Sequence, residues 1–153
     1  ELDKRFEIAS LLAQIYPRDP GPHGVLAAFH VNRGRSELAL SEAREAVRLS
    51  AGKVAGYFNP LVSALLQLNR FDEAKETLLQ AQARQLKVPG FARRLYEIGF
   101  VQNDATLMQA QLDWVRDSTD EMQTLDWQAQ TAAFSGRLGA AQVFSQRASA
   151  IAR

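Results

Sequence analysis

The segment Leu68-Asn69-Arg70-Phe71-Asp72-Glu73-Ala74 decides the fold of this 153-residue chain. A short break at Asn69 separates two segments in which apolar residues recur every three or four positions, as they do at Leu61, Leu65 and Leu68. This spacing gathers apolar side chains on one face of a helix. We therefore predict two helices joined by a tight turn at this point of the chain.

The same kind of turn recurs at regular intervals along the sequence. Four turn residues follow one another at steps of 35, 34 and 33 positions: Gly34, Asn69, Asn103 and Gly136. Five positions after each turn lies a small or helix-favouring residue, and a second set follows seven positions later: Ala39, Ala74, Met108 and Ala141, then Ala46, Ala81, Val115 and Ala148. Small residues belong where two helices approach closely, and larger ones fill the space between: Leu26, Leu61, Leu95, Phe71 and Leu78. A period near 34 residues that holds two helices indicates a repeat array.

Helix-start signals fall at matching intervals. Asp19 followed by Pro20 provides an N-cap and a proline at the first helical position. Ser118 followed by Glu121 forms a capping box, and Asn69 and Asn103 are expected to start the helices that follow them. Ala, Leu, Gln, Arg and Glu, all good helix formers, dominate the composition. The sequence therefore predicts an all-α fold with helices at 2–15, 20–33, 36–50, 53–68, 71–86, 89–102, 104–117, 119–134 and 137–152.

The two-helix period resembles that of the tetratricopeptide repeat (TPR) family. The resemblance is partial, because the position where the family prefers a large aromatic residue holds His23, Phe58, Ala92 and Leu125 here. It implies a right-handed α-solenoid of antiparallel helix hairpins, about four repeats plus a leading helix. The expected divisions are 1–17 (helix B of a truncated repeat), 18–51, 52–87, 88–118 and 119–153, the four repeats of one continuous domain.

Several stretches resemble more specifically the TPR region that follows the kinase domain in a group of bacterial serine/threonine protein kinases: Tyr16–Asp19, Leu68–Lys75, Gln80–Ala83, Leu95–Phe100 and Gly136–Leu138. Related arrays follow winged-helix domains in bacterial transcriptional regulators. This resemblance implies a non-catalytic regulatory region, with the kinase or DNA-binding domain located before Glu1. The Gly-rich loop, His-Arg-Asp and Asp-Phe-Gly motifs of a kinase do not occur in the sequence, so no kinase activity is expected of this chain itself.

Composition excludes several other classes of protein. Eighteen Lys and Arg residues against seventeen Asp and Glu residues leave a net charge of +1, which disfavours a nucleic-acid binder that neutralises many phosphates. The chain has no Cys, which excludes disulfides and thiolate chemistry. No apolar run approaches the ~20 residues of a membrane helix. These features leave the cellular compartment open.

Helix A of each repeat lines the inner face of such arrays, so we expect a peptide or protein partner on that face. Carrying the groove positions of the family onto this sequence gives these binding candidates: Asn32, Asn59, Ser63, Gln67, Arg93, Glu97, Phe100, Asp126, Gln130 and Phe134. Exposed amides can pair with the main chain of an extended peptide, and the two phenylalanines can anchor its apolar side chains. The first repeat offers Gly24 and Ala28 at the positions where chaperone-binding members hold a terminal carboxylate, so that partner is disfavoured.

The remaining candidates have plainer interpretations. His23 and His30 are seven residues apart, about 10 Å along a helix, which is too far for one zinc ion. We expect no metal and no cofactor, and we expect His30, Trp114 and Trp127 to pack between helices. Three alternatives stay open: a homodimer through the ends of the solenoid, a sensor of a small molecule and, with least support from the residues present, an enzyme.

Overall fold

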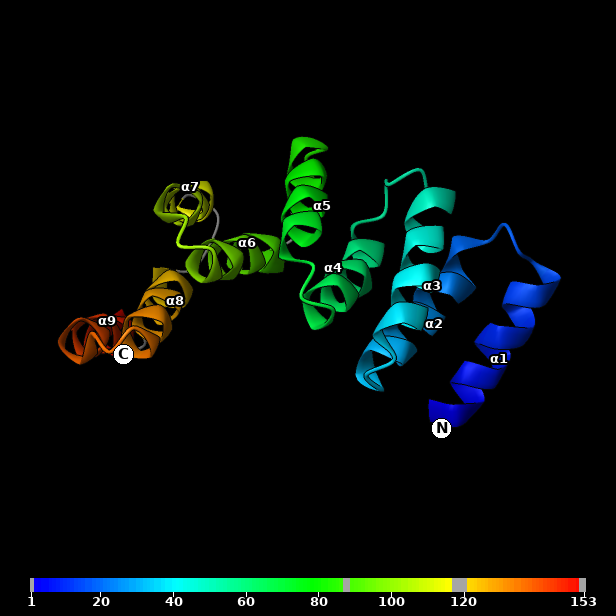
Figure 1. Ribbon diagram of the computed structural model, residues 1–153, viewed down its shortest axis with the longest axis horizontal. Helices are drawn as coiled ribbons and strands as arrows, with labels where there is room; N and C mark the ends of the chain where they lie inside the picture. Colours follow the sequence, from blue (N-terminus) through cyan, green and yellow to red (C-terminus); the bar gives the residue numbers. More distant parts are fainter. Residues whose placement is uncertain (1, 87–88, 117–120, 152–153) are drawn as a thin grey trace. The chain divides into compact units, whose positions relative to one another are not determined.

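The structure is a computed structural model that describes residues 2–86, 89–116 and 121–151 (Figure 1). These residues form nine α-helices and one short 3₁₀ helix, and none of them belongs to a β-strand. The predicted all-α fold is therefore confirmed. The chain divides into two compact units, Glu1–Lys87 (unit 1) and Val88–Arg153 (unit 2).

Unit 1 packs its helices in the order of the sequence. Each α-helix contacts the next one along the chain, and α2 also contacts α4. The helix α4 thus lies against both members of the preceding pair, α2 and α3. The bounds are α1 (Leu2–Ile15), α2 (Pro20–Asn32), α3 (Ser36–Leu49), η1 (Ala55–Tyr57), α4 (Phe58–Gln67) and α5 (Phe71–Ala83).

Unit 2 contains two packed helix pairs, α6 with α7 and α8 with α9. Their bounds are α6 (Pro89–Val101), α7 (Ala105–Val115), α8 (Glu121–Phe134) and α9 (Leu138–Ile151). Tyr96 of α6, Val115 of α7 and Trp127 of α8 meet in one buried cluster. This shared core joins the two pairs of unit 2.

The four periodic turns found in the sequence share one backbone conformation. Their residues all have left-handed φ angles: Gly34 at 67°, Asn69 at 57°, Asn103 at 56° and Gly136 at 72°. In each turn the next N–H donates to the carbonyl five residues earlier: Arg35 to His30 at 2.9 Å, Arg70 to Leu65 at 2.9 Å, Asp104 to Gly99 at 2.7 Å and Arg137 to Ala132 at 2.8 Å. This is the Schellman ending of a helix, which satisfies carbonyls that the last helical turn leaves unpaired. The sequence period of 33 to 35 residues therefore corresponds to one type of helix ending that recurs along the backbone at the same interval.

The helix caps are only partly as predicted. Asp19 caps α2, with Oδ1 accepting from the N–H of Gly21 at 2.8 Å. The expectation that Asn69 and Asn103 start the following helices is wrong, because both adopt the left-handed conformation that ends the preceding helix. Asp104 caps α7 instead and accepts from the N–H of Leu107 at 2.9 Å. The predicted capping box begins at Ser118, which lies outside the described residues.

Most helix bounds agree with the predictions to within two residues, and the exceptions have backbone causes. The helix expected at 53–68 begins only at Phe58, because Ala51 and Gly52 both have positive φ angles after α3 and the short η1 comes next. The helix expected at 71–86 ends at Ala83, because Gln85 adopts a φ angle of 59°. Left-handed residues thus end the second helix of both pairs in unit 1.

Small residues lie at the close helix contacts, as the spacing predicted. Ala39, Ala46, Ala74 and Ala81 are fully buried, whereas Ala141 on α9 is only half-buried. An alanine methyl group lets two helix backbones approach more closely than a larger side chain would. The alanine positions of the period therefore belong to the core in unit 1.

Two of the three packing predictions for the ring side chains are confirmed. His30 is buried, with its ring edge-on to Phe6 and Phe29 at 5.8 and 5.9 Å. Trp127 is only 5% exposed, but Trp114 is 48% exposed, so its predicted burial is wrong. On α7 the neighbouring Val115 takes the core position, which turns Trp114 toward solvent.

Candidate peptide-binding surface

Six of the ten predicted binding residues lie on two helices of unit 2. They follow one another at three- or four-residue steps, which places them on one face of each helix: Arg93, Glu97 and Phe100 on α6, and Asp126, Gln130 and Phe134 on α8. The two sets meet where Arg93 approaches Gln130 and where the ring of Phe100 contacts that of Phe134. We call these six residues the α6–α8 surface.

One end of the α6–α8 surface is polar. Arg93 Nε donates to Glu97 Oε1 at 2.8 Å, and its Nη2 lies 3.5 Å from Gln130 Oε1 on the neighbouring helix. Gln130 Nε2 in turn donates to Asp126 Oδ2 at 2.7 Å. All four residues are exposed, and together they carry one positive and two negative charges. The polar end therefore offers fixed donors and acceptors with an excess of negative charge.

The other end of the surface is aromatic. The rings of Phe100 and Phe134 meet edge to face, with centroids 5.8 Å apart and planes at 87°. Phe100 is half-buried, whereas Phe134 is 86% exposed. Aromatic pairs prefer this geometry, and an exposed ring beside polar groups is typical of a contact surface. The pair can receive an apolar side chain of a partner.

The four candidates in unit 1 are arranged less favourably. Asn32 and Asn59 are exposed at the end of α2 and the start of α4, and Ser63 is half-buried. Gln67 already uses both ends of its amide, since Nε2 donates to the Val31 carbonyl at 3.2 Å and Oε1 accepts from Ser36 Oγ at 2.7 Å. Gln67 therefore links α4 to the α2–α3 turn rather than offering an amide that is free for a peptide.

Gly24, another predicted groove position in unit 1, is covered by a residue of the 3₁₀ helix η1. A Cβ atom built on Gly24 would lie 2.5 Å from Cε1 of Tyr57, so the tyrosine ring covers this glycine. The late start of α4 explains why the sequence pattern missed this contact. Tyr57 was expected within a regular helix, and the turn that moves its ring depends on the φ angles of Ala51 and Gly52.

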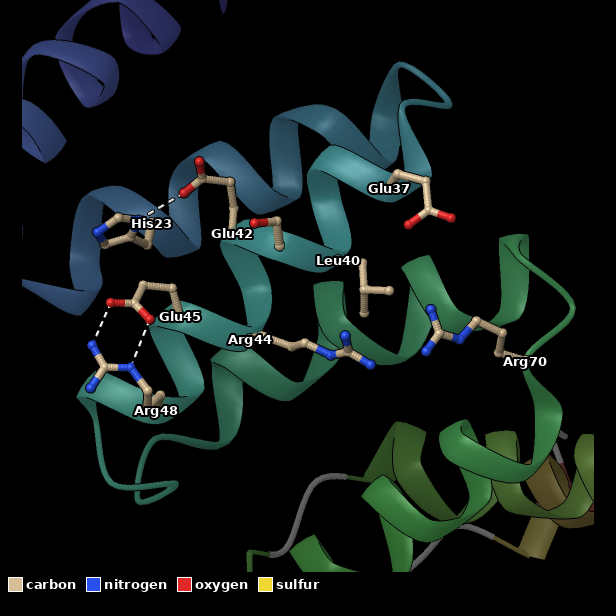
Figure 2. A pocket seen from close by; sticks show the side chains of 9 residues that line it. His23, Glu37, Leu40, Glu42, Arg44, Glu45, Arg48 and Arg70 are labelled. Atoms are coloured by element: carbon tan, nitrogen blue, oxygen red, sulfur yellow. Dashed lines mark hydrogen bonds and ion pairs between the residues drawn. The ribbon is translucent and has the colours of Figure 1, made fainter.

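The sequence did not predict the charged pocket in unit 1 that is drawn in Figure 2. It has a volume of about 450 Å³ and lies between the start of α2, one face of α3 and the residue before α5. His23 Nδ1 and Glu42 Oε2 are 2.7 Å apart across the α2–α3 pair. His23 lies eleven residues before Gly34 and Glu42 eight residues after it, so the pairing depends on how α2 and α3 pack and not on the spacing from the turn alone.

Each of the three arginines that line this pocket is paired with a carboxylate of the protein. Arg48 binds Glu45 through two of its nitrogens, and Arg70 and Arg44 both bind Glu73. The hydrogen bond from Arg48 lowers the pKa of Glu45, and the bond from Arg70 lowers the pKa of Glu73. Because these carboxylates already have arginine partners, the pocket offers a ligand little uncompensated charge.

His23 is poorly placed for acid–base chemistry in this pocket. Its Nδ1 is occupied by Glu42, and its Nε2 is buried without a hydrogen-bond partner in the described part of the chain. A general base must reach the proton that it removes from a substrate. Among the described residues, moreover, no three His, Asp or Glu side chains gather closely enough to hold a metal ion.

Comparison with known protein families gives no match for this chain, and no curated protein is significantly similar to it in sequence. Within the described ranges, every helix is too short or too polar to cross a lipid bilayer. Function is therefore inferred from the geometry of the described surfaces.

Proposed function

We propose that this chain is a non-catalytic, TPR-like interaction module that binds an extended peptide of a partner protein. The observation that carries the proposal is the α6–α8 surface, where a hydrogen-bonded polar cluster lies beside an exposed aromatic pair. The ring of Phe134 is exposed to water, and burying apolar surface stabilises a protein or complex by ~25 cal/mol per Å². A bound peptide that covers this ring would gain that free energy.

The proposed architecture is a right-handed α-solenoid of about four repeats. Two observations support it: the four identical helix endings at one period, and the sequential helix pairs within each unit. In this architecture α2, α4, α6 and α8 are the first helices of repeats 18–51, 52–87, 88–118 and 119–153, and α1 is the remaining helix of a truncated repeat. The α6–α8 surface is then part of the inner face.

The chemistry of the α6–α8 surface defines the peptide that it would bind. Gln130 and Phe134 are one helical turn apart, about 6 Å, which equals two residues of an extended strand. The carboxylates of Glu97 and Asp126 outnumber the guanidinium of Arg93. We therefore infer a peptide in which a Lys or Arg and a large apolar residue are two positions apart, the first facing the two carboxylates and the second covering the ring of Phe134.

The parent protein is proposed from the sequence resemblance alone. The stretches described above favour the TPR region of a bacterial serine/threonine protein kinase, and the related region of a winged-helix transcriptional regulator is the alternative. In either case the module would recruit or sense a partner for a catalytic or DNA-binding domain elsewhere in the polypeptide.

An array of short peptides tests this function. Peptides with the basic–apolar spacing should bind the chain, and Phe134→Ala or Asp126→Asn should weaken binding about tenfold or more, as loss of an interface anchor does. Trp114→Ala is the matched control, because Trp114 is also an exposed aromatic residue but lies on α7. Hits that survive both surface variants, or that are lost only in Trp114→Ala, would contradict the proposed site.

A further inference from the structure

The two carboxylates of the α6–α8 surface are linked to each other through the side chain of Arg93. Arg93 Nε donates to Glu97 Oε1 at 2.8 Å, and its Nη2 lies 3.5 Å from Gln130 Oε1. Gln130 Nε2 continues the chain of hydrogen bonds to Asp126 Oδ2 at 2.7 Å. In the free protein, the guanidinium of Arg93 therefore occupies one acceptor on α6 and one acceptor on α8.

The basic residue of a bound peptide needs the same kind of partner as Arg93. A Lys or Arg side chain carries only hydrogen-bond donors, so it seeks acceptors such as Glu97 Oε1 and Gln130 Oε1. Both of these atoms already face the guanidinium of Arg93. A second cation placed beside Arg93 would also be repelled by its positive charge. The basic residue of the peptide and Arg93 therefore compete for one place on the surface.

We propose that Arg93 is an internal competitor for the basic residue of the bound peptide, a role that rests on the proposed function of the α6–α8 surface. In the free chain Arg93 occupies Glu97 and Gln130. When the peptide binds, its Lys or Arg takes this place and the side chain of Arg93 moves into the solvent. Arg93 thereby lowers the affinity for a basic peptide, whereas a peptide without a cation has no need to displace it.

The bonds of Arg93 are of a kind that a ligand can displace. The side chains of Arg93 and Glu97 are 45% and 48% exposed, and ion pairs this open to water stabilise a protein only weakly. In a helix, moreover, an acid four residues before a base is more favourable than the reverse order found here. The displaced side chain also regains its rotamer freedom in water. The exchange is therefore feasible, but it reduces the net binding free energy of the peptide.

Arg93→Gln tests this role, because glutamine keeps a polar side chain and removes the charge. The probe is a short labelled peptide of Ser and Thr that contains one Lys and, two positions later, one Phe, and its binding is followed by fluorescence anisotropy. We expect Arg93→Gln to bind this peptide about threefold more tightly than the wild type, or better, in a chain of unchanged helix content. Arg116→Gln is the matched control and should bind as the wild type does, since it removes the same charge from another surface ion pair of unit 2, with Asp113 of α7.

A change in the peptide separates this exchange from a general effect on the surface. When the Lys of the probe is replaced by norleucine, which is apolar and carries no charge, the gain from Arg93→Gln should disappear. Arg93→Lys keeps the positive charge on the protein, so it should bind the Lys peptide much as the wild type does. High salt should reduce the gain from Arg93→Gln, because it screens exposed charges.

The outcomes distinguish this role from the proposed function itself. If the wild type binds the Lys peptide through Phe134 but Arg93→Gln binds it equally or more weakly, Arg93 is an ordinary contact and not a competitor. An equal gain with the norleucine peptide would also overturn the role, because no cation would then be exchanged. If neither protein binds the Lys peptide, the proposed function fails and the role of Arg93 with it. Binding by Arg93→Gln alone would support both.

Discussion

The hydroxyl oxygen of Tyr96 lies 3.1 Å from Oγ1 of Thr131, in the buried contact between α6 and α8. The two residues are 35 positions apart, about one repeat period. Thr131 Oγ1 also donates to the Trp127 carbonyl at 3.0 Å, so its proton is used and Tyr96 supplies the other. Both buried hydroxyls are thereby satisfied, and the pair fixes the two helices that carry the α6–α8 surface.

A double-mutant cycle should show that this hydrogen bond couples the two helices. Tyr96→Phe and Thr131→Val should each lower the free energy of unfolding by about 1 kcal/mol, because each leaves a buried hydroxyl without its partner. The double variant should lose less than the two single losses combined, by about 0.5–1.5 kcal/mol. Urea unfolding measures all four proteins. Strictly additive losses would show that the two hydroxyls do not interact.

The helices and their pairing could be predicted from the sequence because they depend on local patterns. Apolar spacing sets the helix faces, and turn residues such as Gly34 and Gly136 set the period. The same reasoning placed Asn69 and Asn103 on the wrong side of the turn, since asparagine favours both a helix N-cap and the left-handed ending. Only the φ angle distinguishes these two roles.

The binding candidates were less predictable, because their use depends on contacts between helices. The face that holds Arg93 and Gln130 follows from helical spacing, but the hydrogen bond between the two side chains depends on the packing of α6 against α8. The two bonds of the Gln67 amide, to the Val31 carbonyl and to Ser36 Oγ, likewise depend on how the helices of unit 1 pack. The burial of the tryptophans likewise depends on the packing of their helices. Trp127 of α8 lies in the core of unit 2, whereas on α7 the core position is taken by Val115 and the preceding Trp114 is exposed.

The left-handed turn at Gly34 should be sensitive to a side chain for conformational reasons alone. Gly34 has a φ angle of 67°, and a Cβ atom there would meet no atom within 4 Å. Gly34→Ala should therefore lower the free energy of unfolding by about 1–2 kcal/mol, the cost of a left-handed alanine. Gly139→Ala on α9 also enters open space but within a helix, so it should be neutral or stabilising by up to about 1 kcal/mol. Thermal unfolding of both variants makes the comparison, and equal losses would contradict a backbone cause.

The close approach of α6 and α7 should make Gly99 intolerant of a methyl group. A Cβ atom there would lie 3.0 Å from Cγ of Met108 and 3.1 Å from the carbonyl oxygen of Asp104. The backbone atom cannot move away cheaply, so Gly99→Ala should cost about 1–3 kcal/mol of unfolding free energy. Gly90→Ala is the control on the same helix, where a Cβ atom meets nothing within 4 Å. A Gly99 variant as stable as the Gly90 variant would show that the two helices separate easily.

Burial of His30 should make the stability of unit 1 depend on pH. Burial lowers the pKa of His30 below 6.5, Arg35 acts in the same direction, and the negative charge of Glu42 acts against it. The unfolded chain therefore binds a proton at this residue more readily than the folded chain. The resulting stability is fully present above pH 6.5 and is lost as the pH falls below that value.

His30→Gln removes this titration while keeping a polar side chain of similar size. Urea unfolding between about pH 7.5 and 5.5 should show a smaller loss of stability in the variant than in the wild type. Because the two proteins share every other titratable group, the difference between them isolates His30, and equal losses would contradict the prediction.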